Sequence, residues 1–209
     1  IGKREGIGAL LADGCRSAAE KIGKDAHKYA LHIKGLELPM HDPRLNPGLA
    51  TSYKIDATPG RHTQMSAWTL EAAFAPPGLV TDEFERYQTE GKGQVYRVIS
   101  AHHHASSAAG MCIFSWCNMK PESLSDSLKY VTGRDYTLDD IQQIGDRMAA
   151  LRAAFNAREG FRSIDLPVPG RMVGSPPLTG GPLKDVTLDI NTQIRDYLEA
   201  MGWATKTGV

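Results

Sequence analysis

The sequence has little cysteine and no surplus of charge of either sign. Its 209 residues include only three cysteines, an odd number that fits a reducing compartment better than a disulfide framework. The 24 basic and 24 acidic side chains give a formal net charge of zero. This balance removes the usual electrostatic reason to expect a nucleic-acid partner.

Long apolar runs and a signal-like start are lacking as well. No apolar run approaches the roughly 18 residues that a membrane span needs, and the N-terminus does not resemble a signal peptide. Together with the few cysteines, these absences predict a cytoplasmic protein with no membrane contact. The hydrophobic content of 41% and the charged content of 23% are ordinary for a globular chain.

What the sequence does have is helical periodicity, and no convincing alternating strand of useful length. We expect helices over residues 7–22, 25–31, 66–74, 81–90, 92–109 and 187–201, and a further helix that begins at Thr137 and continues at least to Phe155. Apolar stripes support the first and the longest helix: Ile7, Leu10, Leu11, Ala18 and Ile22, and Ile141, Ile144, Met148, Leu151 and Phe155. Thr137 and Asp140 form a capping-box pattern at the start of the latter. The predicted fold class is all-α and multihelical.

Two segments are rich in proline and glycine, residues 34–61 and residues 162–186. Their prolines interrupt any continuous helix. A long loop inside a compact chain is usually functional or a domain junction, which we expect of the first segment. We expect the second segment to wrap the surface.

Histidines and cysteines are the candidate functional groups. His102, His103 and His104 are consecutive, and neighbours on a helix point about 100° apart, so they cannot share one ion. Packing or hydrogen bonding is the better interpretation, although one of them can still face a cavity. His62 ends the constrained loop TPGRH and is either a surface residue or a proton-transfer group.

The cysteines allow two interpretations. Cys112 and Cys117 do not match a complete metal-binding spacing, and Cys15 lies near an apolar helical stripe. A 4Fe-4S cluster needs four thiolates, so this chain can donate at most part of such a site. The alternative is that its cysteines are structural. A hydrolase is disfavoured, because no G-x-S-x-G elbow and no typical cysteine activation motif is present.

Several of these stretches resemble the tungsten- or molybdenum-containing aldehyde ferredoxin oxidoreductase family. Residues 4–44 resemble the family run R-E-G-I-G, L-A-x-G, A-A-E-x-I-G and H-V-K-G-L-E-x-P-x-Y-D-P-R. Residues 48–62 resemble G-L-A-x-A-T-S-x-R-G-A-C-H, and SAAGMC at residues 107–112 resembles D-x-x-G-L-C. FNAREGF and MGW match later segments, so the resemblance covers nearly the whole chain.

The resemblance implies a piece of a longer polypeptide. Residues 1–44 would be the end of the middle helical domain, and residues 45–209 the C-terminal helical domain, incomplete at its end. An N-terminal β domain, three cluster cysteines and a first pterin loop would lie in the missing N-terminal domains of the parent chain. The partners implied are those domains, ferredoxin and a small-molecule aldehyde.

The resemblance also implies roles for particular residues. Cys112 would be the fourth ligand of a 4Fe-4S cluster, and Ser107, Gly110 and Met111 would contact a bis-molybdopterin-type tungsten or molybdenum cofactor. His62 would be catalytic, as a hydrogen-bond donor to the aldehyde oxygen or a proton relay. Ser107 stands where the family has Asp, which puts the pterin contact there in question.

The implied activity of the parent protein is oxidation of an aldehyde to a carboxylic acid, whereas the fragment alone would be inactive. Arg61 replaces a small residue or cysteine of the family, which narrows the pocket or favours an anionic substrate. The alternative is a helical scaffold module that keeps the fold and has lost cofactor binding, and Ser107 is its best support.

Overall fold

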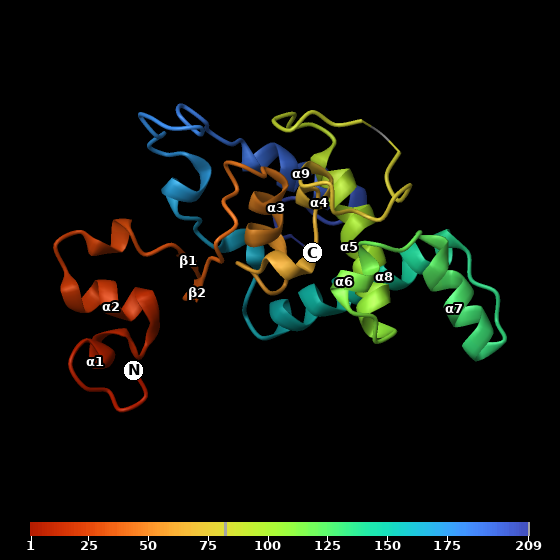
Figure 1. The fold of residues 1–209 in the computed structure, drawn as a ribbon, viewed down its shortest axis with the longest axis horizontal. Coiled ribbons are helices and arrows are strands. Elements are labelled where there is room, and N and C mark those ends of the chain that lie inside the picture. Colours follow the sequence, from red (N-terminus) through yellow and green to blue (C-terminus); the bar gives the residue numbers. More distant parts are fainter. Residues whose placement is uncertain (82, 209) are drawn as a thin grey trace.

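The computed structural model describes residues 1–81 and 83–208, and its elements are almost entirely helical (Figure 1). The α-helices are α1 (Ile7–Leu11), α2 (Gly14–Ile22), α3 (Gly48–Ile55), α4 (Trp68–Glu71), α5 (Lys92–Ala108), α6 (Ile113–Trp116), α7 (Glu122–Thr132), α8 (Leu138–Arg158) and α9 (Ile190–Met201). Short 3-10 helices are η1 (Ala26–Lys28), η2 (His62–Gln64), η3 (Ser163–Asp165) and η4 (Gly170–Val173). The strands β1 (His32–Ile33) and β2 (Leu36–Glu37) form one antiparallel hairpin. The predicted all-α class is confirmed.

Helix α5 is the central element, and α8 and α9 pack against it. Two glycines allow these close approaches. A Cβ added at Gly145 of α8 would lie 2.1 Å from the carbonyl oxygen of Ala101 on α5, and one at Gly93 of α5 would lie 2.2 Å from the backbone nitrogen of Tyr197 on α9. At both positions the backbones meet where any side chain would prevent contact.

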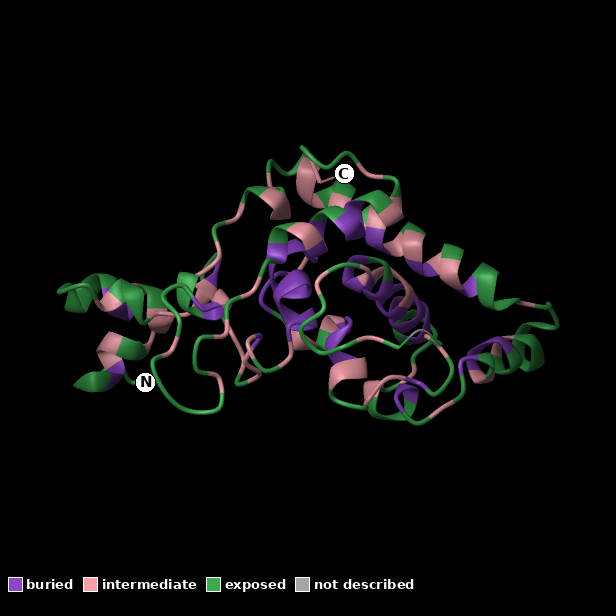
Figure 2. Ribbon diagram, turned by 90° about the horizontal axis from the view of Figure 1, so that it is seen from above, coloured by how far each residue is buried: buried purple, intermediate pink, exposed green. Residues whose placement is uncertain are grey.

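The main hydrophobic core lies among α3, α5 and α9. Its fully buried members include Leu49 and Tyr53 from α3, Tyr96 and Ile99 from α5, and Leu198 from α9. Figure 2 shows that the buried positions concentrate in the middle of the molecule. A smaller cluster of Ala105, Leu124 and Ile141 joins α5, α7 and α8.

The N-terminal segment differs from its prediction. Instead of one helix, α1 and α2 are separated at Ala12 and Asp13, and Gly14 has a φ of +85°. The predicted stripe is buried at Ala18, but its large members Ile7 and Ile22 are 75% and 53% exposed. Both helices lie apart from the core in Figures 1 and 2, so their apolar side chains have little to pack against.

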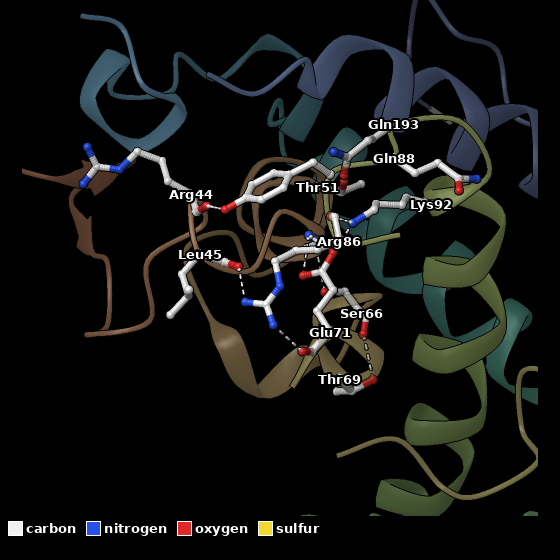
Figure 3. A network of polar contacts seen from close by, with 12 residues as sticks. Arg44, Leu45, Thr51, Ser66, Thr69, Glu71, Arg86, Gln88, Lys92 and Gln193 are labelled. Atoms are coloured by element: carbon white, nitrogen blue, oxygen red, sulfur yellow. Dashed lines mark hydrogen bonds and ion pairs between the residues drawn. The ribbon is translucent and has the colours of Figure 1, made fainter. Parts of the chain in front are cut away.

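The helix predicted over residues 81–90 is wrong for residues 81 and 83–90, where the chain makes turns, and residue 82 lies outside the described residues. Side chains hold this segment in place of helical hydrogen bonds (Figure 3). Arg86 donates to the carbonyl oxygens of Leu45 (3.1 Å) and Glu71 (3.2 Å). The buried ammonium of Lys92 contacts both Glu71 Oε1 and the carbonyl oxygen of Arg86.

The other predicted helices contain helical structure, but their boundaries differ from the predicted ones. Residues 25–31 form only the 3-10 turn η1, residues 66–74 contain α4, and residues 92–109 correspond to α5. The last helix begins at Ile190 instead of residue 187, and the Asp189 side chain caps it. None of the helices in the described ranges is long and apolar enough to cross a membrane.

The capping box at the start of α8 is present as predicted, with Asp140 N donating to Thr137 Oγ1 at 3.1 Å and Thr137 N donating to Asp140 Oδ2 at 2.8 Å. The predicted stripe of α8 is buried only in its first half. Leu151 is 71% exposed and Phe155 is 56% exposed.

Candidate functional site

The loop after α5 carries the candidate cluster ligand. Gly110, with a φ of +83°, reverses the chain, and Met111 N donates to Ser106 O at 3.0 Å. Cys112 then stands at the N-cap of α6 with an exposed side chain. A Cβ added at Gly110 would find no atom within 4 Å, so the loop presents an open face there. The Met111 side chain is partly buried and packs on the Ala105 cluster.

His62 begins η2 and is half-buried in a row of rings. Its imidazole centroid lies 4.5 Å from that of His41, which in turn lies 5.6 Å from the Trp68 ring. Burial, together with the neighbouring His41, lowers the pKa of His62 below its usual value. His62 is therefore held as a neutral imidazole, able to donate from one nitrogen and accept at the other.

A cavity of about 500 Å³ lies between η2, α5 and α8. Its lining residues are Thr58, Arg61, Thr63, Gln64, His103, His104, Ser107, Ile113, Met148 and Arg152. His62 and Cys112 do not line it, but Arg61 and Thr63 flank the former and Ile113 follows the latter. The cavity thus brings together the two segments that carry the predicted catalytic and cluster residues.

The three consecutive histidines diverge, as the helical geometry predicts. His102 accepts from Trp116 Nε1 at 2.8 Å through Nδ1, and its Nε2 lies 3.2 Å from Pro121 O. His103 Nε2 lies 3.3 Å from Ser107 Oγ. Burial lowers the pKa of His103 and of His104 to about 4, so both are neutral at neutral pH. His103 and His104 line the cavity, whereas the sequence indicated that one of the three could face it.

A partly buried ion pair borders the cavity, with Arg152 lining it and Asp56 buried behind it. Arg152 donates to Asp56 Oδ1 at 3.0 Å, to Thr58 Oγ1 at 3.0 Å and to His104 Nε2 at 3.1 Å. Tyr96 also contacts Asp56, through its hydroxyl at 3.4 Å. Asp56 and Arg152 are 96 positions apart, so no local motif in the sequence links them.

The described residues cannot build a metal site alone. Within them, no group of three or more His, Cys, Asp or Glu side chains is arranged to hold a metal ion. Cys117 is buried, its thiol donates to Phe114 O at 3.3 Å, and burial raises its pKa. Cys15 lies on the distant α2 and is partly buried. The loop therefore fits the donation of one accessible thiolate, from Cys112, to a cluster whose other ligands come from elsewhere.

The Ser107 position fits a cofactor less fully. Its hydroxyl is exposed at the end of α5 and can make a hydrogen bond, but it is already close to His103 and carries no charge. A neutral, shorter side chain cannot reproduce the charge-assisted bond of an aspartate.

Comparison with known proteins identifies the family of this chain. The family described as aldehyde ferredoxin oxidoreductase, domains 2 & 3, matches residues 1–209. Tungsten-containing aldehyde ferredoxin oxidoreductases of Pyrococcus horikoshii and Pyrococcus furiosus are each 27% identical to this chain over 97% of its residues. A WOR-like subunit of an aliphatic sulfonate oxidoreductase from Pyrococcus furiosus is 40% identical over 73 residues, which are 32% of this chain and 12% of that protein.

The chain spans about a third of the length of the two full-length relatives, 32% and 33%. The match nevertheless covers every element described above, including η2 and the loop that follows α5. This chain belongs to the aldehyde ferredoxin oxidoreductase family and corresponds to its domains 2 and 3.

Proposed function

We propose that this chain is the C-terminal part of an aldehyde:ferredoxin oxidoreductase that oxidises an aldehyde to a carboxylic acid. The overall change consumes water and releases two protons and two electrons. A bis-molybdopterin-type tungsten or molybdenum cofactor and a 4Fe-4S cluster would supply the redox chemistry when bound, passing the electrons singly to ferredoxin. Family membership supports this proposal, as do the printed names of the full-length relatives.

The observation that carries the proposal is the exposed thiol of Cys112. In a chain whose other loop cysteine is buried, the sulfur at the N-cap of α6 is accessible to a group outside this chain. Gly110 leaves the adjoining surface open for the close approach of a flat ring to the main chain. Cys112 would hold the cluster, and the backbone of Gly110 and Met111 would border the pterin.

His62 would act on the aldehyde. A neutral imidazole can donate a hydrogen bond to the carbonyl oxygen while its other nitrogen takes part in proton transfer. Burial and the neighbouring His41 ring keep His62 in this neutral form.

The test is a pair of cysteine variants in the full-length parent protein, prepared anaerobically. We expect Cys112→Ala to lose the iron and the reduced-cluster EPR signal, because the cluster loses one of four ligands. Cys117→Ala is the matched control and should keep both, since its sulfur is buried five residues away. An intact cluster in Cys112→Ala would overturn the proposed ligand role.

A second candidate is a helical scaffold that has lost the cofactor. The specific observation in its favour is Ser107, a neutral residue already close to His103. The metal content of the full-length protein separates the two candidates. Stoichiometric tungsten or molybdenum with an iron–sulfur absorption band supports the enzyme, whereas a metal-free protein supports the scaffold.

A further inference from the structure

The cavity between η2, α5 and α8 contains an excess of positive charge. Arg61 and Arg152 line it, and none of its lining residues is an aspartate or a glutamate. The other polar lining groups are hydroxyls, an amide and two imidazoles that burial keeps neutral. A cavity with cationic walls and no acid of its own attracts anions.

The two guanidinium groups contribute differently. The charge of Arg152 is balanced by Asp56, which lies behind the cavity wall and fixes the guanidinium together with Thr58. In the described part of the chain, Arg61 has neither a hydrogen bond nor an ion pair. The net surplus in the cavity is therefore one positive charge, which matches a monoanion.

His103 provides an independent sign of a missing partner. Its side chain is only 6% exposed and lines the cavity, and its Nδ1 atom is buried without any hydrogen-bond partner in the described structure. When the Ser107 hydroxyl donates to Nε2, Nδ1 carries the hydrogen and is a donor that lacks an acceptor. Leaving such a group unpaired costs free energy. Ser107, the exposed hydrogen-bond partner of this imidazole, is the member of the pair that a ligand in the cavity can reach.

We infer that this cavity binds a carboxylate group, with Arg61 as the ion-pair partner and the Ser107–His103 pair and Thr63 as neutral hydrogen-bonding groups. Within the proposed function, on which this extension rests, the preferred substrate would be an aldehyde that also carries a carboxylate. Binding of the carboxylate itself requires no cofactor, so it can be measured separately from turnover.

The experiment compares butyrate with butyramide, a neutral molecule of nearly the same shape, by NMR titration of the chain at neutral pH. We expect saturable shifts of the His103 imidazole signals with butyrate and none with butyramide. Arg61→Ala should weaken butyrate binding about tenfold, the size expected when one charge-assisted hydrogen bond is lost. Arg61→Lys should restore part of the affinity.

Arg147→Ala is the matched control, because Arg147 is an exposed cation on α8 that does not line the cavity. Its removal lowers the net charge of the chain equally and should leave butyrate binding unchanged. Equal binding of butyramide, equal weakening by Arg147→Ala, or no butyrate binding at all would each refute the inference. In the full-length enzyme, Arg61→Ala should raise KM for a carboxylate-bearing aldehyde and leave KM for a neutral aldehyde unchanged.

The two proposals can fail separately. If the parent protein contains no metal, the proposed oxidation chemistry is refuted. The result of the butyrate titration does not depend on that outcome. Conversely, if butyrate does not bind, the proposed carboxylate subsite is refuted. The cluster measurement would still decide the role of Cys112.

Discussion

His103 and His104 are buried, and burial favours the neutral form of both imidazoles. Burial lowers both pKa values from 6.5 to about 4. Around them lie His102, Asp56 and Arg152, and Arg152 donates to His104. Below pH 6.5 these two histidines become protonated in the unfolded chain, whereas in the folded chain they become protonated only near pH 4. The free energy of unfolding therefore decreases as the pH falls from 6.5 to about 4.

We therefore expect the urea midpoint to be steady above about pH 7 and to fall between about pH 6.5 and pH 4. His104→Gln keeps an acceptor for Arg152 but cannot be protonated, so it should reduce this loss. His27→Gln, at an exposed position, should not. An identical pH dependence in wild type and His104→Gln would contradict the assignment.

Single residues also show the limits of the sequence. The Cys112 loop and His62 could be singled out, because each stands in a short recognisable stretch. Their roles as ligand and catalyst remain predictions. The Asp56–Arg152 pair could not be found, since the two side chains meet only after α3 and α8 have packed. The free Nδ1 of His103 is likewise a property of the packed state.

At the scale of the element, apolar spacing located α5 although it has no side-chain cap, and a capping pattern located the start of α8 to the residue. Thr137 and Asp140 located the start of α8, and a capping box acts entirely within its own turn. Helix α3 was missed because the prolines around it suggested a continuous loop. Pro47 lies at its N-cap, a position where the missing N–H costs nothing. Helix α7 was also missed; it has no side-chain cap, and Pro121 precedes it.

The contact between α5 and α8 yields a prediction for the helix pair. Gly145→Ala would place a methyl group 2.1 Å from Ala101 O, and a helix backbone cannot move away without disturbing the core. We expect a loss of about 1–3 kcal/mol in the free energy of unfolding, measured by urea denaturation, despite the better helix propensity of alanine.

Gly180→Ala serves as the control for that substitution. An added Cβ at Gly180 meets no atom within 4 Å, so the variant should be as stable as the wild type. A Gly145→Ala protein of unchanged or higher stability would mean that α5 and α8 are not in close contact at this point.

At the scale of the whole molecule, the structure separates a packed body from a loosely attached N-terminus. The main core cluster contains no residue before Ile33. The contacts of α2 with the remainder include a single long-range hydrogen bond of 2.6 Å, from Cys15 N to Glu37 Oε1. The domain boundary predicted after residue 44 remains a prediction, although the sparse packing of residues 1–24 is compatible with it.

This difference in packing predicts how the chain tolerates truncation. Removal of residues 1–24 should shift Tm by less than about 3 °C, because little buried apolar surface is lost and about 1 kcal/mol corresponds to 2–4 °C at this size. The emission of Trp68 and Trp116, both buried, should be preserved. Removal of residues 190–209 is the contrasting deletion, since it takes Ile194, Tyr197 and Leu198 from the core and should abolish cooperative unfolding. If the N-terminal deletion unfolded the chain as the C-terminal one does, α1 and α2 would have to be integral to the body, and the exposure of Ile7 and Ile22 would need a different explanation.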